Sequence, residues 1–190
     1  MSLLPIEAHL PDLKRILQVH RNAVLAAPPG AGKTTRIPLS LLAEAWLTGQ
    51  KIILLEPRRL AARAAARRMA FMMNEAVGQT VGYRMRLERK VSAATRIEVV
   101  TEGVLTRRVQ NDPALTSVGL VIFDEFHERS IHADTGLAFC LDIQEGFRPD
   151  LRLLIMSATI DTEAISGLLG NAPIIQALGR QFPVETRYRP

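Results

Sequence analysis

The sequence predicts an α/β domain with a mostly parallel β-sheet that carries helices on both faces. Two observations predict this fold class. Segments of strand length alternate along the chain with segments of helical periodicity, as in a sheet built from strand–helix–strand units. The strand segments are continuously apolar, which is typical of strands covered on both faces. The chain has 190 residues, a length that suits a single domain of ordinary size.

The elements can be placed in order from the apolar runs and from the residues that end them. Strands are expected where short apolar runs stop at turn or charged residues: 22–27, 51–56, 81–85, 96–101, 119–123, 151–156 and 174–177. Helices are expected where apolar residues recur every three or four positions: 33–46, 59–74, 102–110, 133–144 and 162–169. Residues 179–190 differ in character and resemble a linker or the first strand of a further unit.

The composition is that of a folded protein with a basic surface. Apolar residues make up 47% of the chain and charged residues 23%, which excludes disorder as the main state. The single cysteine excludes a disulfide framework and a cysteine-based zinc site. The net charge is +5, and most of the 24 basic residues are arginine. This surplus fits either a mildly basic surface or a polyanionic partner such as nucleic acid.

Nothing in the sequence indicates a membrane segment or an export signal. The apolar runs have the length of strands and are far too short to span a bilayer. The opening residues lack the basic start and the apolar core of a signal peptide. We therefore expect a cytoplasmic protein with no membrane association.

The segment between the first expected strand and the first expected helix has the pattern of a phosphate-binding loop rather than of an incidental glycine-rich turn. Residues 27–34 match GxxxxGK[ST] except at Ala27, which replaces the first glycine. Gly30 and Gly32 allow turns that point N–H groups at an anion, and the helix N-terminus adds partial positive charge. Lys33 can reach the β- and γ-phosphates, and the Thr34 hydroxyl can bind Mg²⁺. The predicted nucleotide-binding residues are Pro29, Gly30, Ala31, Gly32, Lys33, Thr34 and Thr35.

Two neighbouring carboxylates follow the apolar strand expected at 119–123. Asp124 and Glu125 would lie at the carboxyl end of a parallel strand, the edge where such sheets bind ligands. Asp124 is placed to hold Mg²⁺, and Glu125 is placed to orient and deprotonate an attacking water. The alternative is a solvated acidic turn, which the apolar run before the pair disfavours. Together with the phosphate-binding loop, the pair predicts a site for a nucleoside triphosphate and Mg²⁺.

Residues 124–130 read Asp-Glu-Phe-His-Glu-Arg-Ser, and this segment resembles the DEAH box and its extension. By its motifs the chain is similar to the superfamily-2 DEAH-type helicases over almost its whole length, and more narrowly to their bacterial HrpB-type subfamily. Phe126 departs from the DEAH spelling at its third position, as it does in HrpB-type sequences. The other segments that resemble motifs of these helicases occur in the family's order at 57–59, 82–86, 101–103, 157–159 and 179–184.

The resemblance implies a RecA-like P-loop NTPase domain that binds ATP and Mg²⁺ as part of an ATP-dependent RNA helicase. It implies residues 1–178 as the first RecA-like domain and residues 179–190 as the start of a linker to a second such domain in cis. Because the second domain supplies arginine fingers in this family, residues 1–190 alone are expected to have little activity, and we expect them to be monomeric. The catalytic residues that the resemblance implies are Lys33, Asp124, Glu125 and His127, with Thr34 and Asp124 as metal ligands.

The resemblance also implies contacts to single-stranded RNA with little sequence specificity. The residues implied are Arg58, Arg59, Thr101, Glu102 and Gly103. For Thr101 an ordinary helix cap is the alternative. Ser157 and Thr159 are implied to relay the nucleotide state to the RNA face, although they could simply satisfy buried backbone groups. His127 is implied to couple hydrolysis to domain movement, with a buried structural histidine as the alternative.

The helix expected at 59–74 should present a basic stripe to solvent. Arg59, Arg63 and Arg67 recur every four residues and form this stripe. The opposite, buried stripe is expected to hold Ala61, Ala65, Met69 and Met72. Arg68 falls among these apolar residues, where its stem could pack on the core while its charge reaches water. The resemblance implies another role for Arg68, which is to stack on the adenine base.

A GTPase or a nucleotide kinase is the rival interpretation of the phosphate-binding loop. It leaves the segments at 57–59, 124–130 and 157–159 unexplained, and the NKxD motif by which GTPases read their base is missing. A domain that binds ATP and nucleic acid without turnover is a third interpretation.

Overall fold

A single eight-stranded sheet forms the centre of the molecule. The structure, a computed structural model, describes residues 4–158 and 162–177. The strands are β1 Asn22–Ala26, β2 Lys51–Leu55, β3 Val81–Met85, β4 Glu88–Lys90, β5 Ile97–Val100, β6 Val118–Phe123, β7 Arg152–Ser157 and β8 Ile174–Gln176. Their order across the sheet is β4-β3-β5-β2-β6-β7-β1-β8. Neighbouring strands are parallel, except that β3 and β4 form an antiparallel hairpin. The predicted mostly parallel sheet is confirmed.

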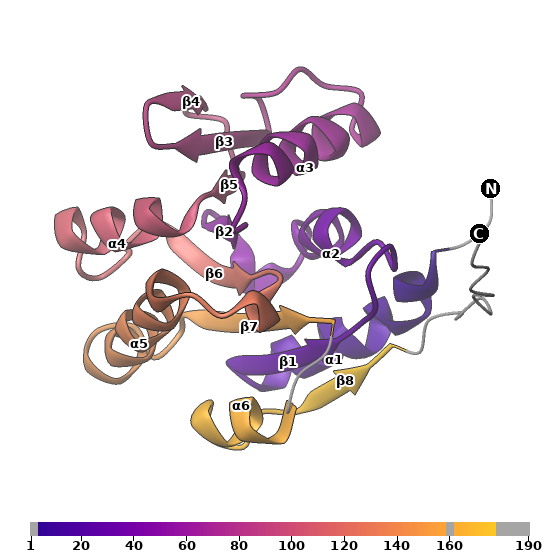
Figure 1. Cartoon of the computed structure of the whole chain (residues 1–190), viewed down its shortest axis with the longest axis vertical. Coiled ribbons are helices and arrows are strands. Elements are labelled where there is room, and N and C mark those ends of the chain that lie inside the picture. The colour runs from indigo at the N-terminus through magenta and orange to yellow at the C-terminus, as the bar shows by residue number, and fades with distance from the viewer. Residues whose placement is uncertain (1–3, 159–161, 178–190) are drawn as a thin grey trace, which may run out of the picture.

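Helices cover both faces of the sheet (Figure 1). The α-helices are α1 Leu10–Val19, α2 Lys33–Leu41, α3 Arg59–Met72, α4 Glu102–Asn111, α5 Ile131–Gly146 and α6 Thr162–Leu168. Short 3₁₀ turns are η1 Pro5–His9, η2 Ala45–Leu47 and η3 Phe126–Glu128. Apolar side chains of α1, α2 and α3 form one core cluster with the sheet, and those of α4, α5 and α6 form a second cluster on its other face. No helix of the described residues is long and apolar enough to cross a membrane.

Helix α1 and strand β4 were not expected from the sequence, and helix α2 is clearly shorter than expected. Helix α1 is amphipathic, with Leu13 and Leu17 buried one turn apart. Strand β4 has no apolar residue to mark it, because it lies at the edge of the sheet and pairs only through the β3 hairpin. Helix α2 ends at Leu41 rather than at residue 46. The apolar spacing continues beyond that point through a turn and η2, where Leu47 is again fully buried.

The parallel strands bring the predicted site residues to one edge of the sheet. Strands β1, β2, β5, β6 and β7 all run in the same direction, so the loops that follow them emerge together. These loops begin at Ala27, Glu56, Thr101, Asp124 and Ala158. Segments that are far apart in the sequence therefore surround one region at the carboxyl ends of the strands.

Candidate nucleotide site and adjoining basic groove

The loop between β1 and α2 has the backbone shape that its glycines predict. Gly30 and Gly32 have φ values of +76° and +92°, in the left-handed region that residues with a side chain rarely adopt. Helix α2 begins directly afterwards, at Lys33. Ala27, which departs from the usual glycine, is buried, and its N–H donates to the Ser157 carbonyl over 2.9 Å. The alanine therefore fits the core at the start of the loop.

The loop meets the acidic pair at the end of β6. The Lys33 ammonium lies 2.7 Å from Oε1 of Glu125, and the Thr34 hydroxyl donates to Oδ2 of Asp124. The other Asp124 oxygen accepts the Glu125 N–H over 2.9 Å. Lys33 and Asp124 are both almost completely buried. The structure thus joins residues that stand about ninety positions apart in one network of charge-assisted hydrogen bonds.

The carboxylates in and around this network repel one another, because the nearby positive charge does not fully neutralise them. Burial raises the pKa of Asp124 to about 6, and the Glu125 carboxylate adds to this, while Thr34 and Lys33 act in the opposite direction. Burial also raises the pKa of Glu56 to about 8, and the carboxylates of Asp124, Glu125 and Glu128 raise it further. A divalent cation would relieve this repulsion. One hydroxyl and one carboxylate, Thr34 and Asp124, suit Mg²⁺, which retains waters and accepts phosphate oxygens as further ligands.

The turn after the acidic pair connects this network to the end of β7. Glu125 has a φ of +49°, a strained left-handed conformation that starts η3. The Nδ1 atom of His127 lies 3.4 Å from Oε2 of Glu125 and accepts the Ala158 N–H over 3.4 Å. The hydroxyl of Ser157 is buried and has no hydrogen-bond partner among the described residues, so its side chain does not satisfy a backbone group there. Thr159 lies outside the described residues.

A pocket of about 590 Å³ opens beside this network and extends to α3. Arg68 lines it, but not from the apolar stripe in which the sequence placed it. The Arg68 side chain is exposed, and its guanidinium lies 5.7 Å from the centre of the Phe71 ring. The remaining lining residues are Pro29, Thr34, Thr35, Glu56, Arg58, Ala61, Ala64, Ala65, Glu125, His127 and Glu128.

The predicted stripes of α3 are therefore partly wrong. The fully buried face consists of Ala62, Ala65, Ala66, Met69 and Ala70. It is rotated from the predicted one towards Ala62, Ala66 and Ala70, which the spacing did not mark as buried. Arg63 is not part of an open basic stripe, since it is half-buried and forms an ion pair with Glu88 of β4.

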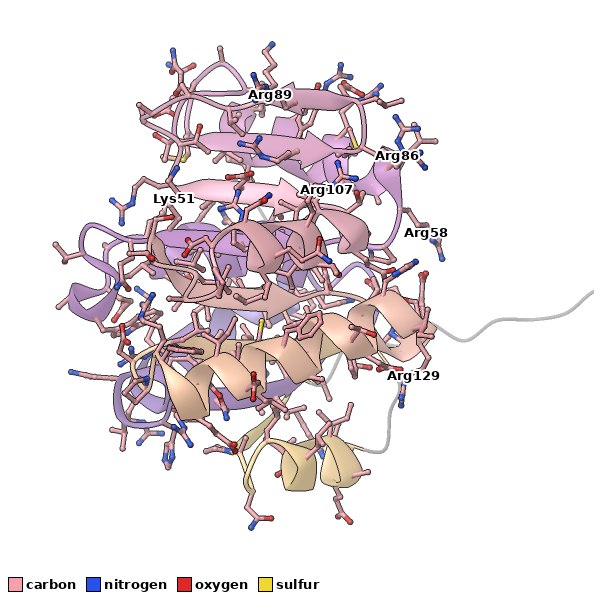
Figure 2. All side chains as sticks on the ribbon, turned by 90° about the vertical axis from the view of Figure 1, so that its left-hand side faces the viewer. Lys51, Arg58, Arg86, Arg89, Arg107 and Arg129 are labelled. Atoms are coloured by element: carbon pink, nitrogen blue, oxygen red, sulfur yellow. The ribbon has the colours of Figure 1, made fainter. Side chains whose placement is uncertain are left out.

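A second, larger groove of about 880 Å³ lies between the β3–β4 hairpin and the start of α4. Thr101, Glu102 and Gly103 line it, as does a set of arginines that were not selected from the sequence: Arg84, Arg86, Arg89 and Arg107. Figure 2 shows Arg86 and Arg107 on the side where the strands end, with Lys51 on the opposite side. The sequence marked residues 82–86 only as a motif, and nothing in the local pattern distinguished Arg89 or Arg107.

The groove is built on a buried ion-pair cluster. Glu98 of β5 is buried, and its carboxylate accepts from Arg84 and Arg108, each over 2.6 Å. Burial would raise the pKa of Glu98, but the two arginines outweigh it and lower the pKa. Glu98 is therefore ionised and holds Arg84 at the wall of the groove.

Three residues predicted to contact nucleic acid have surroundings that the sequence did not reveal. Arg58 lines the pocket of about 590 Å³ and forms an ion pair with Glu128. Glu102 accepts a hydrogen bond of 2.6 Å from the Ser130 hydroxyl. Thr101 stands at the N-cap of α4, but its side chain makes no capping hydrogen bond. Arg59 is exposed on the first turn of α3 and lines neither pocket.

Comparison with known proteins places the chain in a family. The DEAD/DEAH box helicase family model matches residues 12–166. Over its whole length the chain is 57% identical to the ATP-dependent RNA helicase HrpB of Escherichia coli K12, of which it covers 23%. It is 38% identical over 98% of its length to an HrpA homolog from Haemophilus influenzae, and 37% identical over its whole length to human DHX34, a probable ATP-dependent RNA helicase. It covers 14% and 16% of these two proteins.

A solved structure has the same fold. The crystal structure of the E. coli DEAH/RHA helicase HrpB matches 98% of this chain with a TM-score of 0.92, and the chain covers 24% of it. The chain thus spans a quarter or less of the length of these relatives. From its sequence, its fold and the meeting of its phosphate-binding loop with the Asp124–Glu125 pair, the chain belongs to the DEAD/DEAH box helicase family and has the fold of a RecA-like domain.

Proposed function

We propose that this chain is the ATP-binding domain of an ATP-dependent RNA helicase that couples ATP hydrolysis to RNA binding and unwinding. The observation that carries the proposal is the network formed by Lys33, Thr34, Asp124 and Glu125. A cation, a hydroxyl and two carboxylates in these positions are the groups that phosphoryl transfer requires.

Each residue of the network has a distinct task. Lys33 leaves Glu125 and binds the β- and γ-phosphates, because a nucleotide offers it a stronger anionic partner. Thr34 and Asp124 would hold Mg²⁺, and the ion would neutralise phosphate charge. Glu125, released from Lys33, orients the attacking water and accepts its proton. His127 and Ser157, and with them Thr159, pass the state of this site to the rest of the protein.

The base of ATP would lie against α3. Arg68 is exposed at the wall of the nucleotide pocket, and a guanidinium in that position can stack on adenine. Because Arg68 is exposed rather than packed on the core, its position supports stacking on the base.

Single-stranded RNA would lie in the basic groove, with few contacts to its bases. Arg86 and Arg107 offer charge to the phosphates, and the N–H groups at the start of α4, from Thr101 to Gly103, suit an anion. Arg58 and Arg59 would extend this contact towards α3. Phosphate contacts of this kind carry little sequence information.

Hydrolysis at full rate needs groups from elsewhere. We infer that residues 179–190 lead to a second RecA-like domain in cis, which supplies arginine fingers across the nucleotide site, and that residues 1–178 by themselves form a monomeric domain. We also propose that the protein acts in the cytoplasm and that its partner is RNA.

The test is the binding of ATP–Mg²⁺ to the chain with Lys33→Ala. The variant loses the side-chain cation that faces the phosphates, so we expect binding to be abolished or greatly weakened in calorimetry. Lys51→Ala is the matched control, since Lys51 stands at the opposite edge of the sheet (Figure 2). Unchanged affinity in the Lys33 variant would contradict the proposed function.

A further inference from the structure

The segment before α1 packs directly against the phosphate-binding loop. Ile6 is completely buried, and its N–H donates to the Ala31 carbonyl over 3.2 Å. Leu4 lies so close to Gly32 that a Cβ placed on the glycine would come within 2.7 Å of Leu4 Cδ1. The left-handed φ of Gly32 favours glycine there, and the Leu4 side chain packs against its Cα side.

An ion pair ties the same segment to the first turn of α2. Oε1 of Glu7 accepts from Nε of Arg36 over 2.7 Å and from a second N–H of the same guanidinium. The Arg36 backbone N–H in turn donates to the Gly32 carbonyl over 2.9 Å. Glu7 thus fixes the turn in which Lys33 and Thr34 stand, although it touches neither of them.

These contacts form a brace on one side of the loop. They engage the Ala31 carbonyl, the Cα side of Gly32 and the Arg36 side chain, while Lys33 and Thr34 point to the acidic pair. The family model match begins at residue 12, so residues 4–7 lie outside the region that the model covers. A glycine-rich loop loses much conformational entropy when it is ordered, and contacts that order it beforehand reduce the cost of binding.

We propose that residues 4–7 preorganise the phosphate-binding loop, and that Glu7 is a positioning residue for phosphate binding that acts through Arg36. This proposal rests on the proposed function, because it assumes that the loop binds ATP. It predicts that loss of the brace loosens residues 28–36 and weakens nucleotide binding, without a direct contact between Glu7 and the nucleotide.

The first experiment measures amide hydrogen exchange in the nucleotide-free chain. Glu7→Gln keeps the size of the side chain and removes the ion pair. We expect faster exchange of the amides in residues 28–36 than in the parent. Glu44→Gln is the matched control, because Glu44 forms an ion pair with Lys14 of α1 over 3.0 Å, beyond the end of α2. The side chains of the two glutamates are similarly exposed, at 14% and 20%. We expect the control to leave exchange of residues 28–36 unchanged.

The second experiment measures the dissociation constant for ATP–Mg²⁺ and the melting temperature of the free protein. We expect Glu7→Gln to weaken binding roughly fivefold, the effect of a partly exposed ion pair, and Glu44→Gln to leave binding unchanged. The two variants should lose similar thermal stability, so a general loss of stability does not explain the difference. Leu4→Ala gives a second route, since it removes the side-chain contact with Gly32 without leaving an unpaired charge, and it should act like Glu7→Gln.

The outcomes separate the two proposals. If the amides of residues 28–36 exchange equally fast in the unsubstituted chain and in both variants, Glu7→Gln and Leu4→Ala, that result overturns the proposed brace, whatever the affinity for ATP. Faster exchange with an unchanged dissociation constant overturns the positioning role of Glu7. A parent chain that binds no ATP–Mg²⁺ contradicts the proposed function, while the exchange experiment still decides whether the brace exists.

Discussion

Asp124 and Glu125 are neighbours in the chain, but their surroundings give them different chemistry. Asp124 is buried, bound to the Thr34 hydroxyl and has a pKa of about 6. Glu125 is partly exposed and faces Lys33 and His127. The apolar run before the pair predicted that both would stand at the end of a strand. It could not predict which is buried, because that depends on the packing of β2, β6 and η3.

Separate substitutions should reveal the two tasks in the longer protein that we propose contains this chain, called the parent protein below. Glu125→Gln should retain ATP binding and lower turnover by roughly 10²–10⁴-fold, the usual contribution of a general base. Asp124→Ala should instead weaken the Mg²⁺-dependent part of binding. Calorimetry with and without Mg²⁺, together with single-turnover kinetics, measures both effects. A common binding defect with no separate chemical defect would show that the division of roles is wrong.

Glu56 is a buried acid that the sequence marked only as the end of a strand. It lines the nucleotide pocket, and its pKa of about 8 reflects burial and three neighbouring carboxylates. Between pH 4.5, its ordinary pKa, and about 8, the unfolded chain loses this proton while the folded chain keeps it. Folding stability contributed by this group is therefore present at low pH and is lost as the pH rises to about 8.

Glu56→Gln should remove this loss. We expect the variant to be more stable than the parent by roughly 2–4 kcal/mol at about pH 9, and nearly equal to it at about pH 4. Urea unfolding at the two pH values measures the difference. Glu163→Gln, at an exposed position of α6, is the control and should change little at either pH. A gain of the same size at both pH values would show that burial of charge is not the cause.

At the scale of elements, the sequence predicts a strand or a helix best where a single pattern of apolar residues determines it. The strands at the centre of the sheet were found from continuous apolar runs, because both of their faces are covered. Strand β4 was missed because a hairpin edge needs no apolar face. The face of α3 was misjudged because alanine marks a buried position only weakly, and the role of Arg63 depends on a partner in β4. The two halves of the candidate nucleotide site could be predicted because each follows a strand. The groove instead joins β3, β4 and α4, whose proximity only the fold reveals.

The groove formed by these elements can be tested with Arg86→Ala and Arg107→Ala. Each removes one exposed cation, so RNA affinity should fall for all sequences alike. The slope of log affinity against log salt should become shallower by about 0.7 for each RNA phosphate that the variant no longer neutralises. Titration of a fluorescent single-stranded RNA at several salt concentrations measures both quantities. Lys51→Ala serves as the control for net charge, and an equal effect there would indicate non-specific attraction.

For the molecule as a whole, the arrangement of the site predicts binding without rapid turnover. An arginine finger contributes about 10³–10⁵ in rate to phosphoryl transfer, and we propose that it comes from a second domain. Residues 1–190 should therefore bind ATP–Mg²⁺ modestly, bind RNA weakly and in a salt-sensitive manner, and hydrolyse ATP slowly. Phosphate release by this chain and by the proposed parent protein with its second domain, with and without RNA, measures the difference.

The same preparation with Glu125→Gln controls for contaminating ATPases. Any phosphate release that persists in this variant does not come from the site. RNA-stimulated turnover of residues 1–190 at the rate of the parent protein, abolished by Glu125→Gln, would show that no second domain is needed.

The position of β1 in the sheet also determines when the site can form during synthesis. Strand β1 carries the phosphate-binding loop at its end, and its sheet neighbours are β7 and β8, the last two strands of the described residues. When β1 leaves the ribosome, neither partner has been translated, and its apolar residues have no sheet to join. The loop can therefore reach its final setting only after almost the whole domain has been made, and the apolar residues of β1 stay open to aggregation until β7 arrives. The phosphate-binding loop is therefore translated early but takes its place in the folded domain late.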